Sequence, residues 1–195
     1  MLSWFLGRKL DQFEQTFDYD MSYAREILRL SPKALITYFK ATAMGNYIED
    51  VPPEAFYAAR LVAIAYEDCG PCTQLGATLA GRAGVDAEII ERVIAGDFDA
   101  LPAHVAVTAR FALASMQRSP DADELRDRVE ALFGRRGLLS IAFGMTASRI
   151  YPTIKFALGY GKTCQRVVVD GKTVAKGAIY SDEHAPAPLV AEQAS

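Results

Sequence analysis

Two cysteines separated by a glycine and a proline, Cys69-Gly70-Pro71-Cys72, are the residues of this chain best suited to chemistry. Thiols three positions apart at the start of a helix lie on one side of its first turn, so their sulfurs can form a disulfide. The positive end of the helix dipole favours the thiolate, which is the reactive form of cysteine. Pro71 suits a first helical turn, and Gly70 lets the backbone bend around the outer sulfur. The pattern predicts a redox-active dithiol, with Cys69 at an exposed cap and Cys72 one turn deeper.

Two acidic residues, Glu67 and Asp68, immediately precede this pair. Their negative charge opposes formation of a thiolate at Cys69. The same carboxylates can instead take a proton from a cysteine, so Glu67 is a candidate proton relay in the catalytic group with Cys69 and Cys72. The residues alone leave both effects open.

Other metal-binding or nucleophilic residues are few. The third cysteine, Cys164, is predicted to be an inert core residue, and the two histidines are His104 and His184. A structural zinc site needs four ligands, and these residues are too few and too scattered to supply them beside the dithiol. We expect neither a metal nor a cofactor.

The composition limits the class of protein. The chain has 195 residues, 51% of them hydrophobic and 23% charged, with a formal net charge of −3. These values are typical of a globular domain and give no clustered basic surface for nucleic acid. The apolar start is too short for a signal peptide, no stretch is long enough to span a bilayer, and three cysteines make no extracellular disulfide framework. We expect a cytoplasmic protein with no membrane or nucleic-acid partner.

Hydrophobic periodicity predicts an all-α fold of seven or eight helices. The expected helices cover residues 1–20, 31–47, 55–66, 69–83, 86–96, 102–117, 121–133 and 137–158. Ser31 and Asp86 are expected to cap helix starts, Gly96 to end a helix, and Pro152 to kink or divide the last one. β-branched residues around Asp170-Gly171 predict a hairpin over residues 165–180.

Four segments follow from this pattern. They are an N-terminal helical arm (1–50), a helical core (51–162), a hairpin extension (163–180) and a flexible tail (181–195). The first helix is amphipathic with an acidic polar face. We therefore expect it to pack on its own domain or a neighbouring subunit, rather than to lie in a membrane surface.

Cys-Gly-Pro-Cys is also the tetrapeptide of thioredoxins, but its setting here differs. A thioredoxin motif follows a strand, whereas residues 55–66 have the composition of a buried helix. Asp68 stands where thioredoxins carry a tryptophan. We keep the redox chemistry and reject the thioredoxin fold.

The wider pattern resembles the alkylhydroperoxidase D-like and carboxymuconolactone decarboxylase family. The resemblance covers residues 52–160: it runs from 60–65 through the dithiol into 79–85, and then through the helices expected at 86–96 and 102–116 and after 137. It implies an all-helical bundle that assembles into homo-oligomers. It also implies a peroxidase in which the deeper cysteine, here Cys72, attacks the peroxide and a partner dithiol protein supplies electrons. Accessibility alone favours Cys69 instead.

The chain departs from that family at two positions. Peroxidase members carry a histidine four residues after the second cysteine, where this chain has Gly76. They carry a glutamate about twelve residues before the first cysteine, where this chain has Tyr57, with Glu54 one turn earlier. Either Glu67 or Glu54 takes over the proton relay, or the dithiol works by simple exchange, or the activity has been lost.

Three functions are consistent with these observations. The first is a thiol-disulfide oxidoreductase with an antioxidant role, which reduces a small peroxide or disulfide substrate. The second is a non-catalytic helical homo-oligomeric scaffold or binding protein, whose dithiol is vestigial or redox-sensing. The third is a carboxymuconolactone decarboxylase-like enzyme that acts on a small organic acid through Glu54, Arg60 or His104.

Overall fold

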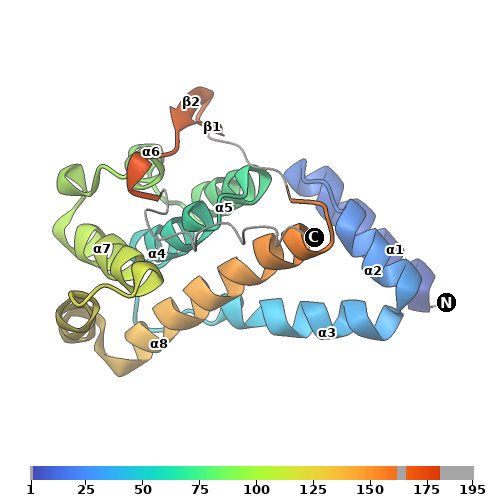
Figure 1. Cartoon of the computed structure of the whole chain (residues 1–195), viewed down its shortest axis with the longest axis horizontal. Coiled ribbons are helices and arrows are strands. Elements are labelled where there is room, and N and C mark those ends of the chain that lie inside the picture. Colours follow the sequence, from blue (N-terminus) through green and yellow to red (C-terminus); the bar gives the residue numbers. More distant parts are fainter. Residues whose placement is uncertain (1, 162–165, 181–195) are drawn as a thin grey trace, which may run out of the picture.

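The computed structural model describes residues 2–161 and 166–180, which form eight α-helices and one small antiparallel sheet (Figure 1). The helices are α1 (Leu2–Phe17), α2 (Ser22–Leu30), α3 (Pro32–Thr42), α4 (Pro53–Tyr66), α5 (Gly70–Arg82), α6 (Ala87–Ala95), α7 (Ala103–Gln117) and α8 (Ala122–Ala157). The strands are β1 (Arg166–Val169) and β2 (Lys172–Ala175), and short 3₁₀ turns are η1 (Ala43–Asn46), η2 (Phe98–Ala100) and η3 (Ala178–Tyr180). The expected all-α fold with a late hairpin is confirmed. The predictions for Cys164, His184 and the tail lie outside the described residues.

Helix α4 forms the centre of the core. It packs against α5, α6, α7 and α8, and residues such as Phe56, Leu61 and Ile64 are fully buried. A helix that is apolar on nearly every side is stable only when neighbours surround it. The chain leaves α4 and turns directly into the cysteine pair, so this rigid helix fixes where the dithiol begins.

Helices α1, α2 and α3 lie at one end of the molecule (Figure 1). They pack on one another, and α3 also packs against α8. Leu10 of α1, Leu35 of α3 and Tyr19 of the connection between α1 and α2 are buried, and they belong to the same hydrophobic cluster as Cys69 and Cys72. The N-terminal segment is therefore part of the environment of the dithiol.

Helix α2 was not predicted from the sequence. Its nine residues bury Tyr23, Ala24 and Ile27 on one face, while Arg25 lies between α2 and α1 and pairs with Asp11 at 2.6 Å. Nine residues are fewer than an isolated helix needs for stability in water. Packing against α1 and α3 supplies the stability of α2. A hydrophobic pattern this short does not predict such a helix from the sequence.

Helix α8 covers two predicted helices, 121–133 and 137–158, except for residues 121 and 158. Only Gly134 within it departs from helical dihedral angles, with φ 68° and ψ 179°, a conformation open essentially to glycine alone. The expected break after residue 133 is therefore a single-residue kink. Of the two outcomes expected at Pro152, a kink or a division of the helix, the division is wrong, because the backbone stays helical through it. A proline removes one intrahelical hydrogen bond, and the buried neighbours Tyr151 and Lys155 hold the helix together there.

The predicted caps and turn are confirmed. Ser31 accepts a hydrogen bond from the Ala34 amide at 3.2 Å, Asp86 accepts one from the Glu88 amide at 2.8 Å, and Gly96 ends α6 in the left-handed region. Asp170 and Gly171 both have positive φ and join β1 to β2. The second strand is shorter than expected: it ends at Ala175, because the chain then turns onto α6, where the Gly177 amide donates to the Ile94 carbonyl at 3.0 Å.

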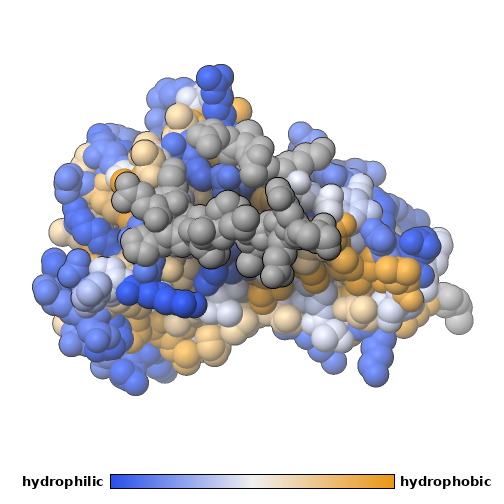
Figure 2. Space-filling model, viewed as in Figure 1, coloured by the Kyte–Doolittle hydropathy of each residue, from blue (hydrophilic) through white to orange (hydrophobic). Residues whose placement is uncertain are grey.

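The surface carries some exposed apolar side chains. Figure 2 shows hydrophobic residues along α8 in the lower part of the view, and Leu139 and Phe156 of this helix are both 42% exposed. Within the described residues, no helix combines the length and apolar character that crossing a bilayer requires. The homo-oligomer implied by the family resemblance stays a prediction.

Candidate functional site

Cys69 and Cys72 form a disulfide at the N-terminus of α5, with their Cα atoms 5.2 Å apart. Cys69 is the residue before the helix, in an extended conformation, and Cys72 lies in its first turn. The backbone amide and the hydroxyl of Thr73 donate to the Cys69 carbonyl at 2.9 and 3.0 Å, which fixes the cap. The predicted closeness of the two sulfurs and their place at a helix start are confirmed.

The prediction that Cys69 lies at an exposed cap is wrong, since both cysteines are 0% exposed. They pack in a cluster with Leu6 and Tyr19 from the N-terminal segment and Tyr151 from α8. These residues are far from the dithiol in sequence. Their coverage of a helix start is a property of tertiary packing and has no local signature.

Two further residues, Tyr19 and Lys155, join the dithiol in the structure. The Tyr19 hydroxyl lies 3.7 Å from Cys72 Sγ, and Lys155 Nζ donates to that hydroxyl at 3.2 Å. Lys155 is only 2% exposed, and its Nζ lies 4.5 Å from the centre of the Tyr19 ring and 5.4 Å from that of Tyr23. Aromatic faces at these distances stabilise a cation. Neither residue was predicted to belong to the site, and the one signal in the sequence was a lysine within the apolar segment 137–158.

The direction of this hydrogen-bond chain follows from its electrostatics. Burial, and secondarily the neighbouring Tyr23, raises the pKa of Tyr19 above its usual value of 10.0, so the hydroxyl keeps its proton. Because the Lys155 ammonium has only protons to offer, it occupies a lone pair of the Tyr19 oxygen. The Tyr19 proton is then free to point at Cys72 Sγ. A thiolate at Cys72 would receive a hydrogen bond backed by a buried cation.

The two carboxylates beside Cys69 are held by cations. Glu67 pairs with Arg149 of α8, and Asp68 pairs with Lys176, whose side chain is 7% exposed. These pairs offset the negative charge that opposes a thiolate at Cys69. Among the described residues, no hydrogen bond joins Glu67 to either cysteine, so its place as proton relay has no contact to support it.

The two positions where the family carries its relay are occupied differently here. Gly76 lies under α4, and a Cβ atom added to it would come within 2.7 Å of Ile64 Cδ1 and 3.2 Å of Leu61 Cδ2. A histidine therefore has no room at this position in the present packing. Tyr57 lies on the cavity described below, with its ring 5.4 Å from the Arg60 guanidinium carbon.

Glu54 and His104 meet at the opposite end of α4, with 3.1 Å between Glu54 Oε1 and His104 Nε2. The backbone amide of Glu54 itself and then the His104 hydrogen bond lower the pKa of this carboxyl from 4.5, against the opposing effect of burial. Glu54 is roughly 18 Å along α4 from its last residue, Tyr66, at 1.5 Å per residue. It is therefore too far from the dithiol to replace the family's glutamate. Arg60 lies on another face of α4 and bonds to Ser148, so the structure does not bring it together with Glu54 and His104.

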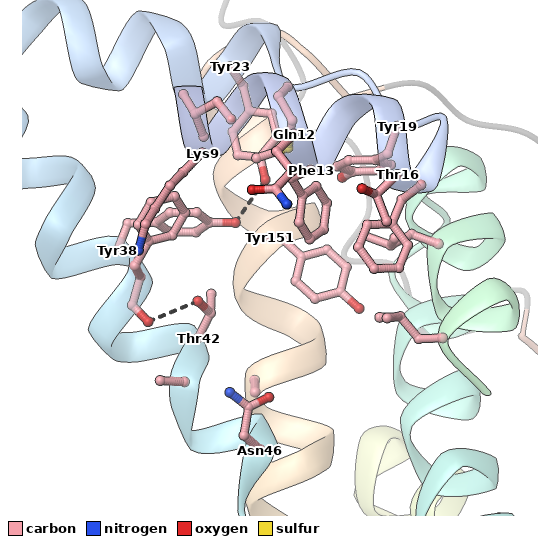
Figure 3. A pocket seen from close by; sticks show the side chains of 18 of the residues that line it. Lys9, Gln12, Phe13, Thr16, Tyr19, Tyr23, Tyr38, Thr42, Asn46 and Tyr151 are labelled. Carbon is pink, nitrogen blue, oxygen red and sulfur yellow. Dashed lines mark hydrogen bonds between the residues drawn. The ribbon is translucent and has the colours of Figure 1, made fainter. Parts of the chain in front are cut away.

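A cavity of about 640 Å³ separates α1, α2 and α3 from α4, α5 and α8. Figure 3 shows Gln12, Thr16, Tyr38 and Asn46 arranged around it, with Tyr151 of α8 in the centre of the view. Tyr19 also lines this cavity. Since its hydroxyl contacts Cys72, Tyr19 links the cavity to the dithiol.

Comparison of the chain with protein-family models, with curated proteins and with solved structures gives no match.

Proposed function

We propose that this chain is a thiol-disulfide oxidoreductase whose Cys69–Cys72 pair reduces hydroperoxides. The observation that carries the proposal is the contact of Cys72 Sγ with Tyr19, whose hydroxyl accepts a hydrogen bond from buried Lys155. A structural disulfide needs no donor beside its sulfur, whereas a thiolate nucleophile gains from one. The helix start at Cys69 adds a favourable dipole.

These contacts favour Cys72 over Cys69 as the attacking residue. Cys72 has the Tyr19 hydroxyl beside its sulfur, and Cys69 adjoins Glu67 and Asp68. Hydrogen bonds to the charged form of a group stabilise that form. The argument that greater exposure favours Cys69 no longer applies, since both cysteines are buried.

The reaction has three steps. The Cys72 thiolate attacks one peroxide oxygen, the O–O bond breaks, and the departing alkoxide takes a proton to become an alcohol, leaving Cys72 as a sulfenic acid. The Cys69 thiol then attacks the Cys72 sulfur, forming the disulfide and releasing water. An external dithiol protein reduces this disulfide by two exchanges and is itself oxidised.

The order of the cysteine pair and its surrounding helices supports placing the chain beside the alkylhydroperoxidase D-like family. In this proposal the Tyr19–Lys155 pair stands in for the histidine and glutamate that Gly76 and Tyr57 replace. The remaining family properties, a homo-oligomer and a cytoplasmic dithiol donor, are parts of the same proposal.

The experiment compares Cys69→Ser, Cys72→Ser and the unaltered chain, each reduced and then mixed with hydrogen peroxide or cumene hydroperoxide. Peroxide loss is followed with dithiothreitol as reductant. We expect both variants to lose turnover, and Cys69→Ser alone to accumulate a sulfenic acid that dimedone traps. Cys164→Ser is the matched control and should keep full turnover. Unchanged turnover in both variants of the pair would overturn the proposal.

A second candidate is a non-catalytic scaffold or binding protein with a redox-sensing disulfide. The observation in its favour is the complete burial of both cysteines, together with the closed position at Gly76. Its signature in the same experiment is slow loss of two thiols per chain, without turnover, accompanied by a change of thermal stability or assembly between the reduced and oxidised forms.

A further inference from the structure

Arg60 brings a positive charge to the wall of the cavity without a carboxylate to match it. Its Nε donates to Ser148 Oγ at 2.9 Å, and its guanidinium carbon lies 5.5 and 5.4 Å from the ring centres of Phe56 and Tyr57. Among the described residues, no Asp or Glu pairs with it. The guanidinium also lies near the Tyr151 hydroxyl, and a guanidinium suits planar oxyanions.

Two glycines lie beside this side chain. A Cβ atom at Gly144 of α8 would lie 3.2 Å from Arg60 Cγ, which is tighter than an ordinary contact, whereas one at Gly45 of η1 would lie 3.7 Å from Arg60 Nη2, which is an ordinary contact distance. The backbone of α8 therefore approaches the aliphatic part of the arginine closely at Gly144. Arg60 is half-buried, and Ser148, Phe56 and Tyr57 contact it at the cavity.

Tyr151 adds a second donor. It is 8% exposed, and within the described part of the chain its hydroxyl makes no hydrogen bond of good geometry, although Ser148 and Arg60 lie close enough to interact with it. Burial raises the pKa of this hydroxyl, while the nearby Arg60 lowers it. A buried hydroxyl without a well-formed hydrogen bond is uncommon, because buried polar groups are almost always hydrogen-bonded. Figure 3 shows the Tyr151 ring among the side chains that surround the cavity.

The rest of the described lining is rich in aromatic side chains, includes the neutral polar residues Gln12, Thr16, Thr42 and Asn46, and lacks negative charge. Eight of the described lining residues are aromatic, Lys9 and Arg60 are its charged members, and none is Asp or Glu. This contrasts with the net charge of −3 for the whole chain. The volume of the cavity, about 640 Å³, lies within the range of small-molecule sites.

We propose that this cavity binds an organic carboxylate with an apolar or aromatic body. The carboxylate oxygens accept from the Arg60 guanidinium and the Tyr151 hydroxyl, and the body lies against the aromatic rings. The site is formed by helices on both sides of the cavity, including the N-terminal segment. It does not depend on the proposed redox reaction, and its test uses the oxidised protein without peroxide.

The experiment measures binding of octanoate and 2-naphthoate by titration calorimetry, with 1-octanol and 2-naphthalenemethanol as the uncharged partners of the same body. We expect each carboxylate to bind at least tenfold more tightly than its alcohol. Arg60→Gln should remove most of this difference, and Tyr151→Phe should reduce the affinity for the carboxylate about threefold to tenfold. Arg110→Gln, a change at an exposed arginine paired with Asp99, is the matched control and should bind like the unaltered chain.

Equal affinity for acid and alcohol, or no measurable binding of either acid, would overturn the proposal. Should Arg60→Gln fail to fold, as seen by circular dichroism, Tyr151→Phe and the comparison of acid with alcohol on the unaltered chain still decide the matter. A failure here leaves the peroxide experiment untouched, since binding is read without any reaction at the cysteines.

Discussion

The Tyr19 hydroxyl lies 3.7 Å from Cys72 Sγ, although 53 positions separate the two residues in the chain. Tyr19 follows α1, and Cys72 lies in the first turn of α5. The N-terminal segment therefore supplies a polar group to the dithiol, besides covering it with apolar side chains. The same hydroxyl accepts from Lys155, so three distant parts of the chain meet at the Tyr19 hydroxyl.

Replacing Tyr19 by phenylalanine should slow the reaction of reduced Cys72 with iodoacetamide at pH 7 about tenfold. The change removes a hydrogen bond to a charged sulfur, which contributes about 1.5 to 3 kcal/mol, while the ring remains to fill the core. The measurement is the alkylation rate of Cys72 followed by mass spectrometry.

Tyr38→Phe is the control for this change. Tyr38 is buried in the same hydrophobic cluster, but its hydroxyl bonds to that of Tyr23 at 2.9 Å, one residue further from the dithiol. Its alkylation rate should match that of the unaltered chain. If both variants slow alkylation alike, general loosening of the cluster is the cause and Tyr19 has no special role.

The helices were largely predictable, because each has a period, a cap or a breaker of its own. Ser31, Asp86 and Gly96 act at element ends through neighbours within three or four residues, which a sequence displays. The dithiol was predictable for the same reason, since its two cysteines share one helical turn.

The remainder of the site was not predictable. The contacts of Tyr19 and Lys155 span 53 and 136 positions, and they depend on how α1, α2 and α3 pack against α8. The burial of Cys69 follows from the same packing. A single sequence carries no local sign of such contacts, and a buried lysine differs from an exposed one only by its neighbours in space.

Replacing Lys155 by methionine should also lower the reactivity of reduced Cys72, by about tenfold, since a buried cation stabilises a nearby thiolate. Methionine keeps much of the side-chain volume, so folding should survive. Because Lys155 acts through the Tyr19 hydroxyl, the double variant with Tyr19→Phe should be little slower than either single one. The measurement is again the alkylation rate.

Lys172→Met is the control, at a lysine whose side chain is 72% exposed on β2. It should leave the rate unchanged. Fully additive effects of the two changes at Tyr19 and Lys155 would contradict the hydrogen-bond chain inferred here and indicate two independent influences on the sulfur.

Replacing Gly76 by histidine, the residue that the alkylhydroperoxidase D-like family carries at the equivalent place, should destabilise the protein by about 3 kcal/mol without raising peroxide turnover. The new side chain must displace Ile64 and Leu61, which are 0% and 1% exposed, and overpacking a core is costly. Gly81→His in the same helix is the matched control, since a Cβ there meets nothing within 4 Å, and we expect a change within about 0.5 kcal/mol. Urea unfolding of both variants makes the comparison, and equal stability of the two would show that Gly76 is not sterically closed.

The Glu54–His104 pair predicts an acid-dependent part of the stability. The pKa of Glu54 is lower in the folded protein than its ordinary value of 4.5, so the unfolded chain binds more protons at this site in the acid range. The resulting stabilisation is complete above about pH 4.5 and is lost as the pH falls through the folded pKa. Glu54→Gln should therefore be less stable than the unaltered chain at neutral pH, and this gap should close in acid.

Thermal unfolding between pH 7 and pH 3 measures the difference in stability between Glu54→Gln and the unaltered chain. This difference should amount to about 1 kcal/mol at neutral pH for a carboxylate in the first turn of a helix. His104→Gln should remove a smaller part of the stabilisation by the Glu54 carboxylate, because the backbone amide of Glu54 lowers the pKa of this carboxyl more than His104 does. A gap that widens towards acid would reverse the sign and show that the carboxyl is destabilised in the fold. Since Glu54 lies far from the dithiol, neither variant should change the alkylation rate of Cys72.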